Sequence, residues 1–343
     1  MPYSLAEIAP ASAPAPEHAP AALTAPAVSV CIANWNCREL LRDCLRSLLR
    51  RPQGVPLEVI VVDNASSDGA PAMVAAEYPE AKLIRNDCNR GFGAASNQAA
   101  AVAQAPYLFF LNNDTVVPPG TLGRLLDYAE DHPEAGIIGP RLCDADGRTQ
   151  VSCRPKPTAA TFLHRTSLLR WTGLLRRDYR RYRREVLQGP EAPRSVETLM
   201  GAAMLMQRDL FRAVGGWDEA YTFGGEDFDL STRVAARQPL HYVPDVSVMH
   251  YSRSSTRLNV AYSAPNVAIG FARYLRKSGG SRGEMFIYKA VVTLDAPLQL
   301  AVKGVQYLWR QAWGRDEKAN NSLQRVQELW YFLTRGLREF WKV

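Results

Sequence analysis

The stretch Leu108 to Thr115 reads LFFLNNDT and decides the fold of this chain. Four large apolar residues are followed at once by two amides and a carboxylate, which are Asn112, Asn113 and Asp114. The apolar run is typical of a buried strand, because strands covered by helices on both faces are apolar at successive positions. The polar residues then stand at the carboxyl end of the strand, where open α/β sheets bind ligands. The stretch therefore predicts an α/β sheet with a polar ligand near Asp114.

Strand-like and helix-like segments alternate on both sides of this stretch. Apolar runs predict strands at residues 28–36, 57–64, 81–86, 106–114, 135–142 and 241–252. Spacing and composition predict helices near residues 41–49, 70–77, 94–103, 118–131 and 227–237. Asn36 is a candidate N-cap of the first helix, with Glu39 as its capping-box partner. Regular alternation of this kind predicts a parallel sheet with helices on both faces.

Composition divides the chain into three parts. Residues 1–27 are rich in Ala and Pro and predict a disordered arm, residues 28–258 carry the alternating pattern, and residues 259–343 read as helical. No uncharged apolar run of membrane-spanning length is present, and the N-terminus does not resemble a signal peptide. The six cysteines form no CxxC pair, so reduced thiols in a cytoplasmic protein are expected.

Positive charge is concentrated near the C-terminus. Residues 271–343 hold 13 Lys or Arg and 6 Asp or Glu, a difference of +7 that equals the net charge of the whole chain. Four of the seven tryptophans also lie there, namely Trp309, Trp313, Trp330 and Trp341. Basic and aromatic residues together suit an anionic membrane surface, although a helical cap that packs its aromatics on the core is an equal alternative. Nucleic acid is not expected as a partner, because no binding motif for it accompanies the charge.

A second basic segment, residues 165–184, holds eight arginines among leucines and aromatics. It suits an anionic acceptor or surface, and the alternative is a solvated helix rich in arginine.

Polar residues end three successive predicted strands. They are Asn34 with Asn36, Asp63 with Asn64, and Asp114 with the two asparagines before it. Parallel strands place their carboxyl ends on one edge of a sheet, so these groups are expected to converge. Asp63 suits the N–H of a pyrimidine base, and Asp114 suits a hard cation that also binds phosphate oxygens. The alternative is that these residues only form turns after strands.

The segment Asn89 to Ser96 (NRGFGAAS) contains a GxG motif that opens a predicted helix. The nicotinamide dinucleotide fingerprint requires Gly or Ala at the position of Ser96 and must follow the first strand of its unit, so that reading is disfavoured. The two glycines are instead expected to let the backbone approach a nucleotide closely.

A second acidic centre is GGED, from Gly224 to Asp227. A general base needs a carboxylate near the reacting hydroxyl, and Asp227 is the candidate, with Glu226 beside it. The two glycines are expected to let the loop close over a substrate. Helix capping by Asp227 is the alternative, but it does not account for two adjacent carboxylates. Three residues shortly upstream are candidate acceptor contacts, namely Trp217, Asp218 and Glu219.

His250 ends the last predicted strand, on the same face as Val246 and Val248. Taken alone it would be a core histidine. Together with Asp114 it is a candidate ligand of a divalent metal.

Taken in order, these motifs resemble family 2 glycosyltransferases of GT-A fold, and most closely the rhamnosyltransferase-like members. The resemblance covers residues 28–258 and depends on SVCIANWN, VIVVDNASSDG, NRGFGAASN, LFFLNNDT, GGWDEAYTFGGEDFDLSTR and VMH. It implies a Rossmann-like, mainly parallel sheet flanked by helices, with a helical C-terminal extension. It also implies metal-dependent, inverting transfer of rhamnose or a similar hexose from a UDP-, dTDP- or GDP-linked donor. The implied acceptor is a glycan or a lipid-linked sugar at the inner face of the membrane, in cell-surface polysaccharide assembly.

The resemblance also implies roles for individual residues. Asp227 matches the catalytic base, and Glu226 would support it or bind the acceptor. Asp114 matches the metal ligand of the DxD motif, and His250 can complete the site for Mn²⁺ or Mg²⁺. The implied nucleotide contacts are Asn34, Asn36, Asp63, Asn64, Asn89, Gly91, Asn112 and Asn113.

Two departures from the family pattern stand out. The DxD position begins with Asn112 instead of Asp, so metal or ribose contacts there would be weaker. The QxxRW motif and the membrane spans of processive synthases are missing, which favours single or few transfers.

Two other functions are alternatives. A sugar-1-phosphate nucleotidylyltransferase shares a nucleotide-binding α/β core, but it needs a Gly-rich loop with Arg and Lys after the first strand. This chain has NWNCREL at that place, which argues against this alternative. A non-catalytic sugar-nucleotide-binding protein would not need Asp114, Glu226 and Asp227 together.

Overall fold

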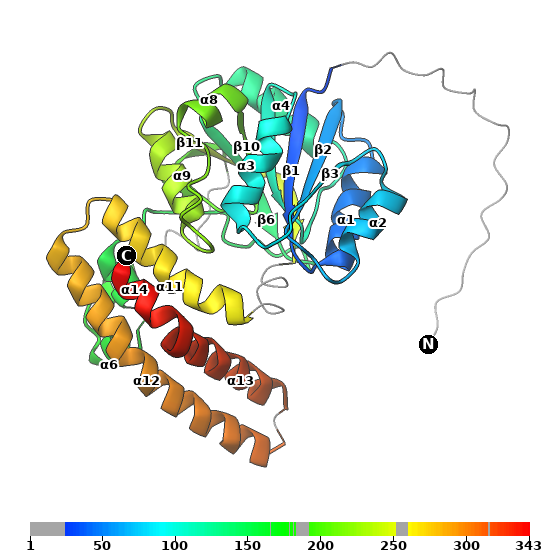
Figure 1. Cartoon of the computed structure of the whole chain (residues 1–343). Coiled ribbons are helices and arrows are strands. Elements are labelled where there is room, and N and C mark those ends of the chain that lie inside the picture. The colour runs from blue at the N-terminus through cyan, green and yellow to red at the C-terminus, as the bar shows by residue number, and fades with distance from the viewer. Residues whose placement is uncertain are drawn as a thin grey trace, which may run out of the picture.

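The computed structural model describes residues 25–251 and 260–343, apart from residues 165, 178, 181, 183–191 and 315. Most of the predicted N-terminal arm, residues 1–24, and the predicted boundary at residues 258–259 therefore lie outside the described residues. Figure 1 shows a twisted sheet flanked by helices, with the C-terminal helices packed beside it as a separate bundle.

A nine-stranded sheet forms the centre of the first part, in the order β3-β2-β1-β4-β10-β6-β11-β5, with β8 paired to β11. Its strands are β1 (Val28–Asn34), β2 (Leu57–Asp63), β3 (Lys82–Arg85), β4 (Tyr107–Asn112), β5 (Thr115–Val116), β6 (Ile137–Cys143), β8 (Arg194–Val196), β10 (Ala203–Gln207) and β11 (Leu240–His250). The three longest pairings are parallel, as predicted, and join β1 to β2, β6 to β11 and β1 to β4, and β3 also runs parallel to β2. β10 lies between these two groups and runs antiparallel to both β4 and β6.

Helices cover both faces of the sheet, and β4 supplies both cores. Phe109 and Leu111 belong to one apolar cluster, and Leu108 and Phe110 belong to the other, because successive strand residues point to opposite faces. The first cluster includes residues of α1 (Arg38–Leu49), α2 (Ala70–Glu77) and α4 (Thr121–Asp131). The second includes residues of α3 (Phe92–Val102), α8 (Arg208–Ala213) and α9 (Glu226–Ala235). The apolar run from Leu108 to Leu111 is therefore buried on both faces of the sheet.

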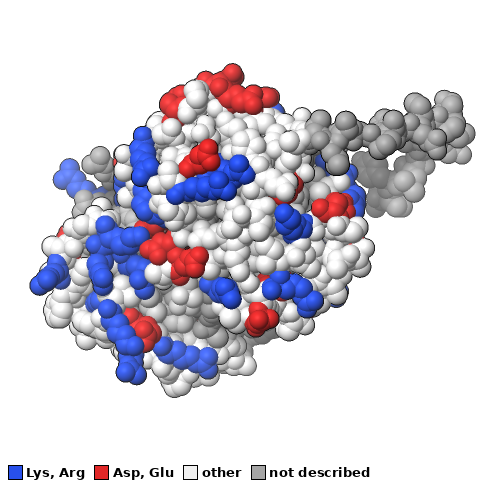
Figure 2. Space-filling view, turned by 45° about the horizontal axis from the view of Figure 1, so that its top comes forward, with Lys and Arg blue, Asp and Glu red and all other residues white. Residues whose placement is uncertain are grey.

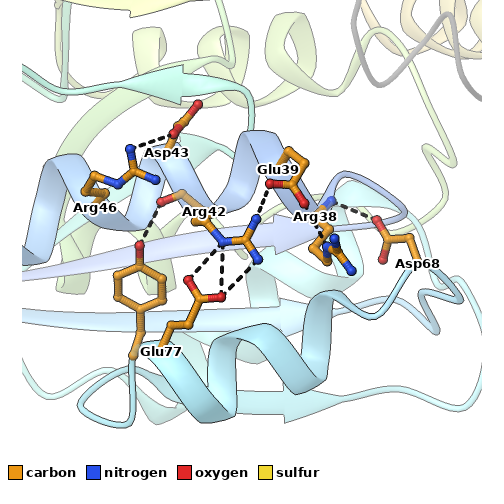
Figure 3. A network of polar contacts seen from close by, with 8 residues as sticks. Arg38, Glu39, Arg42, Asp43, Arg46, Asp68 and Glu77 are labelled. Carbon is orange, nitrogen blue, oxygen red and sulfur yellow. Dashed lines mark hydrogen bonds and ion pairs between the residues drawn. The ribbon is translucent and has the colours of Figure 1, made fainter.

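The start of α1 differs from the predicted capping box. The N-cap is Cys37, and it makes no side-chain cap hydrogen bond. Asp68, in the loop after β2, instead accepts from the backbone N–H of Arg38 at 2.7 Å. Glu39 is paired with Arg38 and Arg42, and Arg42 also binds Glu77 of α2 (Figure 3). The predicted capping box of Asn36 and Glu39 is therefore wrong. Asp68 accepts from the backbone N–H at the start of the helix, and Glu39 pairs with two arginines.

The C-terminal bundle consists of α11 (Val260–Lys277), α12 (Arg282–Ala312), α13 (Asp316–Tyr331), the π-helical turn η1 (Phe332–Gly336) and α14 (Leu337–Lys342). Two short helices from the middle of the chain join it, α5 (Ala159–Leu163) and α6 (Ser167–Thr172). A third apolar cluster holds the bundle together and includes Phe228 of α9, so the bundle is packed on the sheet domain.

Trp309, Trp313, Trp330 and Trp341 are between 40% and 68% exposed, which does not fit the alternative that these aromatics pack on the core. α12 is long and apolar enough to cross a membrane by length and composition alone. It is not an uncharged apolar run, because Lys289, Asp295 and Lys303 lie within it.

All six cysteines lie within the described residues and are unpaired, as predicted. Cys88, in the loop before α3, is exposed, Cys143 is half-buried, and the others are buried.

Candidate active site

The carboxyl ends of β1, β2 and β4 meet at one edge of the sheet, as predicted from their polar residues. Asn34 pairs in register with Asp63, and the Asn34 side chain donates to the Asp63 carboxylate at 2.9 Å. The Asn113 side chain donates to Asn34 Oδ1 at 2.8 Å. Asn34, Asp63 and Asn113 are all buried. The three strand ends are therefore joined by one hydrogen-bond network with Asn34 at its centre.

This network also fixes the loop after β2. The second oxygen of Asp63 accepts from the Ser66 N–H at 2.9 Å. Asn36 has a positive φ of 51°, a conformation that Asn tolerates, and its side-chain oxygen accepts from the Ser67 N–H. Asn34, Asn36 and Asp63 therefore shape the loop that borders the site.

The next loop is held by Asn64 and Asn89. The Asn64 side chain donates to the carbonyl oxygen of Gly91 at 3.2 Å and accepts from the Asn86 side chain at 2.9 Å. Asn89 Oδ1 accepts from the Gly91 N–H, and Gly91 has a positive φ of 87°. Asn64, Asn89 and Gly91 thus lie together, as expected of residues that line one pocket.

The second glycine of the GxG motif has a different role from the one expected. A Cβ atom added at Gly93 would lie 3.3 Å from the Cβ of Trp217. The Asn97 side chain, one turn further along α3, binds the backbone N–H and carbonyl of Trp217. Gly93 therefore admits the Trp217 loop.

Asp114 and His250 face each other at the end of β4. The Nε2 atom of His250 lies 3.3 Å from Oδ1 of Asp114, and Asp114 is 2% exposed. The backbone keeps them adjacent, because β5 pairs with the end of β11 and the Tyr251 N–H donates to the Asp114 carbonyl. The Asn112 side-chain nitrogen lies 3.5 Å from the same Nε2 atom. The predicted partners of Asp114 thus come together.

Gln150, which sequence reasoning missed, determines how His250 is held. Its side-chain NH₂ donates to the carbonyl oxygen of His250 at 2.7 Å, so its Oε1 atom must face the ring. Nδ1 of His250 lies 3.1 Å from that oxygen and therefore donates a proton to it. In the neutral imidazole, the lone pair of Nε2 is then directed at Asp114 and Asn112. Histidines that bind metals in proteins commonly donate their other ring N–H to such an outer partner.

The Asp114–His250 pair fits a divalent cation. Two lone-pair atoms facing each other at 3.3 Å repel unless a proton or a metal ion lies between them. The distance is close to the roughly 3 Å between neighbouring ligands of an octahedral cation with ligand distances of about 2.1 Å. Among the described residues, no group of three or more His, Cys, Asp or Glu side chains could hold a metal ion. A cation held by Asp114 and His250 would therefore need further ligands beyond these two.

The acidic pair Glu226 and Asp227 begins α9, after Gly225. One oxygen of Asp227 accepts from the Phe228 N–H at 2.9 Å. Glu226 Oε2 is buried and has no hydrogen-bond partner within the described part of the chain. Burial and then the Asp227 charge raise the pKa of Glu226 to about 8. A carboxyl in this condition can hold a proton near neutral pH and offer it to a polar ligand.

Arg154, also missed, stands beside this pair. It ends the short strand β7 (Cys153–Arg154), and its guanidinium lies 4.9 Å from the centre of the Phe228 ring. Burial raises the pKa of Asp227, and the positive charge of Arg154 acts in the opposite direction. Arg154 therefore favours the ionised form of Asp227 over that of its neighbour.

The two acidic centres are connected through the start of β10. A Cβ atom added at Gly201 would lie 3.4 Å from the Cβ of Asp227. The next residue, Ala202, accepts a backbone hydrogen bond from Asn112 at 3.0 Å. The acidic pair and the end of β4 thus border the same edge of the sheet.

The predicted acceptor contacts lie elsewhere. Trp217 is 1% exposed and packs edge-on against Phe110. It is a core residue, so the prediction that it contacts the acceptor is wrong. Asp218 pairs with Lys277 of α11 at 2.8 Å, and Glu219 accepts from the Asn97 side chain. These two carboxylates hold elements together in the structure.

The glycines of GGED meet a requirement of packing. Gly224 and Gly225 have φ angles of 84° and 92°, which glycine adopts readily, and both lie against the backbone of α11 at Val267 and Gly270. The lack of a side chain at these two positions makes this close backbone contact possible.

Comparison with known proteins agrees with this architecture. The profile of the family described as "Glycosyl transferase family 2" matches residues 29–215. The chain is 34% identical over 222 residues to N-acetylglucosaminyl-diphospho-decaprenol L-rhamnosyltransferase of Mycobacterium tuberculosis, covering 59% of this chain and 68% of that protein. It is 36% identical over 160 residues to the succinoglycan biosynthesis protein ExoO of Rhizobium meliloti, covering 44% of this chain and 46% of that protein.

The fold has similar solved structures as well. The mannosyltransferase PcManGT from Pyrobaculum calidifontis, in complex with GDP-Man and Mn²⁺, superposes with a TM-score of 0.50 at 20% identity. The superposition covers 93% of this chain and 87% of that one. At this level of identity the likeness shows the GT-A fold, which was predicted.

Proposed function

Because this chain belongs to glycosyl transferase family 2, we propose that it transfers rhamnose or a similar hexose from a nucleotide-diphosphate sugar to an acceptor hydroxyl. The acceptor is a glycan or a lipid-linked sugar in cell-surface polysaccharide assembly, as the names of the mycobacterial and rhizobial relatives state for those proteins. The observation that carries the proposal is the placement of Asp114–His250 and Glu226–Asp227 on one edge of the sheet.

The donor nucleotide binds across the ends of β1, β2 and β4. Asp63 uses one hydrogen bond on each oxygen within the protein, and further lone pairs remain to accept from the N–H of the base. Gly91 and Asn89 border the nucleotide pocket, and Asn36 and Asn64 shape the two loops around it. Asn112 and Asn113, at the carboxyl end of β4, are further nucleotide contacts. The donor is linked to UDP, dTDP or GDP.

Asp114 and His250 would hold Mn²⁺ or Mg²⁺, and Gln150 would keep the Nε2 lone pair directed at the ion. When bound, such a cation neutralises the charge that develops on the leaving diphosphate. Two ligands are available within the described part of the chain, which suits an ion bound together with the nucleotide. Asn112, where the family pattern has Asp, adds no charge to the site.

Asp227 is the proposed base. Arg154 favours its ionised form, so it can take the proton from the acceptor hydroxyl while that oxygen attacks the anomeric carbon from the face opposite the diphosphate. A single displacement of this kind inverts the configuration and needs no second carboxylate across the bond. Glu226, with its unpartnered oxygen, donates a hydrogen bond to the acceptor.

The proposed place of action is the cytoplasmic face of the membrane, where a lipid-linked acceptor is accessible. The concentration of positive charge in residues 271–343 supports a peripheral position at an anionic surface.

A donor panel tests the proposal. The purified full chain is screened by thermal shift against UDP-, dTDP- and GDP-sugars with Mn²⁺ or Mg²⁺, and then assayed for release of the nucleoside diphosphate with a prenyl-diphosphate-linked N-acetylglucosamine acceptor. We expect one donor to raise the melting temperature in a metal-dependent way and to react only with the acceptor present. Full activity in excess chelator would remove the metal role, and the absence of any response across the panel would refute the proposal. Donor binding without turnover would favour a non-catalytic binding protein, and formation of a sugar nucleotide from a sugar phosphate would favour a nucleotidylyltransferase.

A further inference from the structure

One face of α12 is apolar along the whole helix and exposed to solvent. Five large side chains on it and Trp313 at its C-cap are between 53% and 68% exposed, and the five on the helix are Phe286, Ile287, Leu294, Val305 and Leu308. At 100° per residue they fall within one half of the helical circumference. They extend over about 40 Å at 1.5 Å per residue. We call these six residues the α12 face.

The charged residues of α12 lie on the opposite side. Between Met285 and Gln311 they are Lys289, Asp295, Lys303 and Arg310, and none is exposed. Lys289 donates to the carbonyl of Trp341, and Arg310 donates to Ser322 Oγ. Asp295 accepts from the first backbone N–H groups of α6. No charged group therefore interrupts the α12 face.

The position of α12 leaves this face accessible. In Figure 1, α12 runs along the edge of the bundle that is farthest from the sheet, with α11 and α13 on its inner side. Monomeric soluble proteins rarely expose one continuous apolar surface of this length, and such surfaces mark interaction sites.

Charge identifies the kind of partner. The segment that contains α12 carries the whole net charge of the protein, +7. Exposed basic residues of the bundle include Arg276, Arg282, Arg335, Arg338 and Lys342. Figure 2 shows Lys and Arg gathered at its lower left, where the C-terminal helices lie. An exposed apolar stripe, in a bundle that also carries exposed basic residues and tryptophans, matches a helix that lies in the interface of an anionic bilayer.

The same contacts exclude a spanning arrangement. To cross a bilayer, α12 would have to take Lys289 and Asp295 away from their partners in the bundle. An orientation in the plane of the membrane leaves these contacts intact and buries only the α12 face.

We propose that the α12 face inserts into the headgroup region of an anionic membrane, with the helix axis parallel to the membrane plane. The proposal deepens the proposed function, since it assigns the surface that brings the site to a lipid-linked acceptor.

Vesicle flotation of the full chain, without donor or acceptor, tests this proposal. We expect the protein to float with phosphatidylcholine vesicles containing about a third phosphatidylglycerol, and much less with phosphatidylcholine alone. About 1 M salt should weaken the binding without abolishing it, because apolar contacts are not screened. The triple variant Leu294→Gln, Val305→Gln, Leu308→Gln should bind at least about tenfold more weakly.

Controls separate the possible reasons for a loss. The three positions are exposed, so the triple variant should keep the wild-type melting temperature. Val102→Gln, at an exposed apolar position on α3, should leave flotation unchanged. Donor binding in solution is measured on the same samples, so failure of the donor site and failure of the α12 face give different results.

Two outcomes would overturn the proposal. One is equal flotation of the wild type and the triple variant, or no flotation of the wild type. The other is a wild-type dimer in light scattering that the triple variant dissolves while vesicles remain unbound, since the α12 face would then be an interface between two copies.

Discussion

Gly270 of α11 lies directly against the backbone of Gly224, so that a Cβ atom added at Gly270 would stand 1.7 Å from the Gly224 carbonyl oxygen. Gly225, the residue before the acidic pair, is also in close contact, because its own added Cβ would lie 3.0 Å from the Gly270 carbonyl oxygen. Lys277 of the same helix binds Asp218 and Asp229. The C-terminal bundle therefore determines where α9 and its first carboxylates lie.

Gly270→Ala should destabilise the protein. Alanine favours a helix over glycine by up to about 1 kcal/mol, but the clash with a backbone oxygen outweighs this gain, and a net loss of about 1–3 kcal/mol is expected. Denaturant unfolding measures the change. Gly304→Ala on α12 is the matched control, because its added Cβ meets nothing within 4 Å, and it should stabilise the protein slightly. A Gly270→Ala variant as stable as the wild type would contradict the close contact.

Gln150→Leu should weaken metal binding. Without Gln150, Nδ1 of His250 loses its acceptor and the ring no longer has a fixed tautomer. Loss of such an outer partner typically costs about 10- to 100-fold in metal affinity. Titration calorimetry with Mn²⁺ and the donor nucleotide gives the affinity, and ¹⁵N NMR of the imidazole reports the tautomer. Gln104→Leu, at an exposed position, serves as control, and an unchanged tautomer in Gln150→Leu would show that Gln150 does not position the ring.

Asp227→Asn should abolish transfer while leaving nucleotide binding nearly intact. Loss of a general base lowers kcat by about 10²- to 10⁴-fold, whereas the nucleotide contacts lie on other strands. Glu226→Gln can still donate a hydrogen bond, so its kcat should fall much less. Calorimetry of the nucleotide and turnover are measured on both variants. Equal loss of binding and turnover in Asp227→Asn would refute the assignment of the base.

The buried carboxyl of Glu226 should make the stability of the protein depend on pH. Its pKa in the folded state is about 8, above the ordinary value of 4.5, so the folded state retains a proton that the unfolded state has released. The free energy of unfolding should therefore fall as the pH rises between these values. Glu226→Gln removes this titration, so its stability should fall less over the same range. Parallel curves for the wild type and the variant in denaturant unfolding would show that Glu226 is not perturbed.

Local patterns were sufficient to predict the sheet and most of the candidate site. Apolar runs that end in Asn or Asp identified β1, β2 and β4, and the rule that parallel strands end on one edge brought Asn34, Asp63 and Asp114 together. His250 was predicted only because Asp114 needed a partner, since its strand face alone suggested a core residue.

The remaining features depend on contacts between distant segments. Gln150 follows a short turn after β6, and nothing in its neighbourhood indicates that it binds a residue 100 positions away. Trp217 looked like a binding residue beside two carboxylates, and only its packing against Phe92 of α3 and Phe110 of β4 makes it part of the core. The two glycines of GGED suggested mobility because the partner that requires them, Gly270, lies on a helix that the pattern could not place.

The uneven exposure of the thiols makes this protein suitable for site-specific labelling without prior mutagenesis. Cys88 is exposed, whereas four cysteines are buried and Cys143 is half-buried. Burial raises the pKa of the Cys37 thiol to about 11 and that of Cys44 to about 12, so neither forms the reactive thiolate at neutral pH. A maleimide dye should therefore attach first at Cys88, next to Asn89. Its fluorescence would then follow the arrival and departure of a nucleotide in real time.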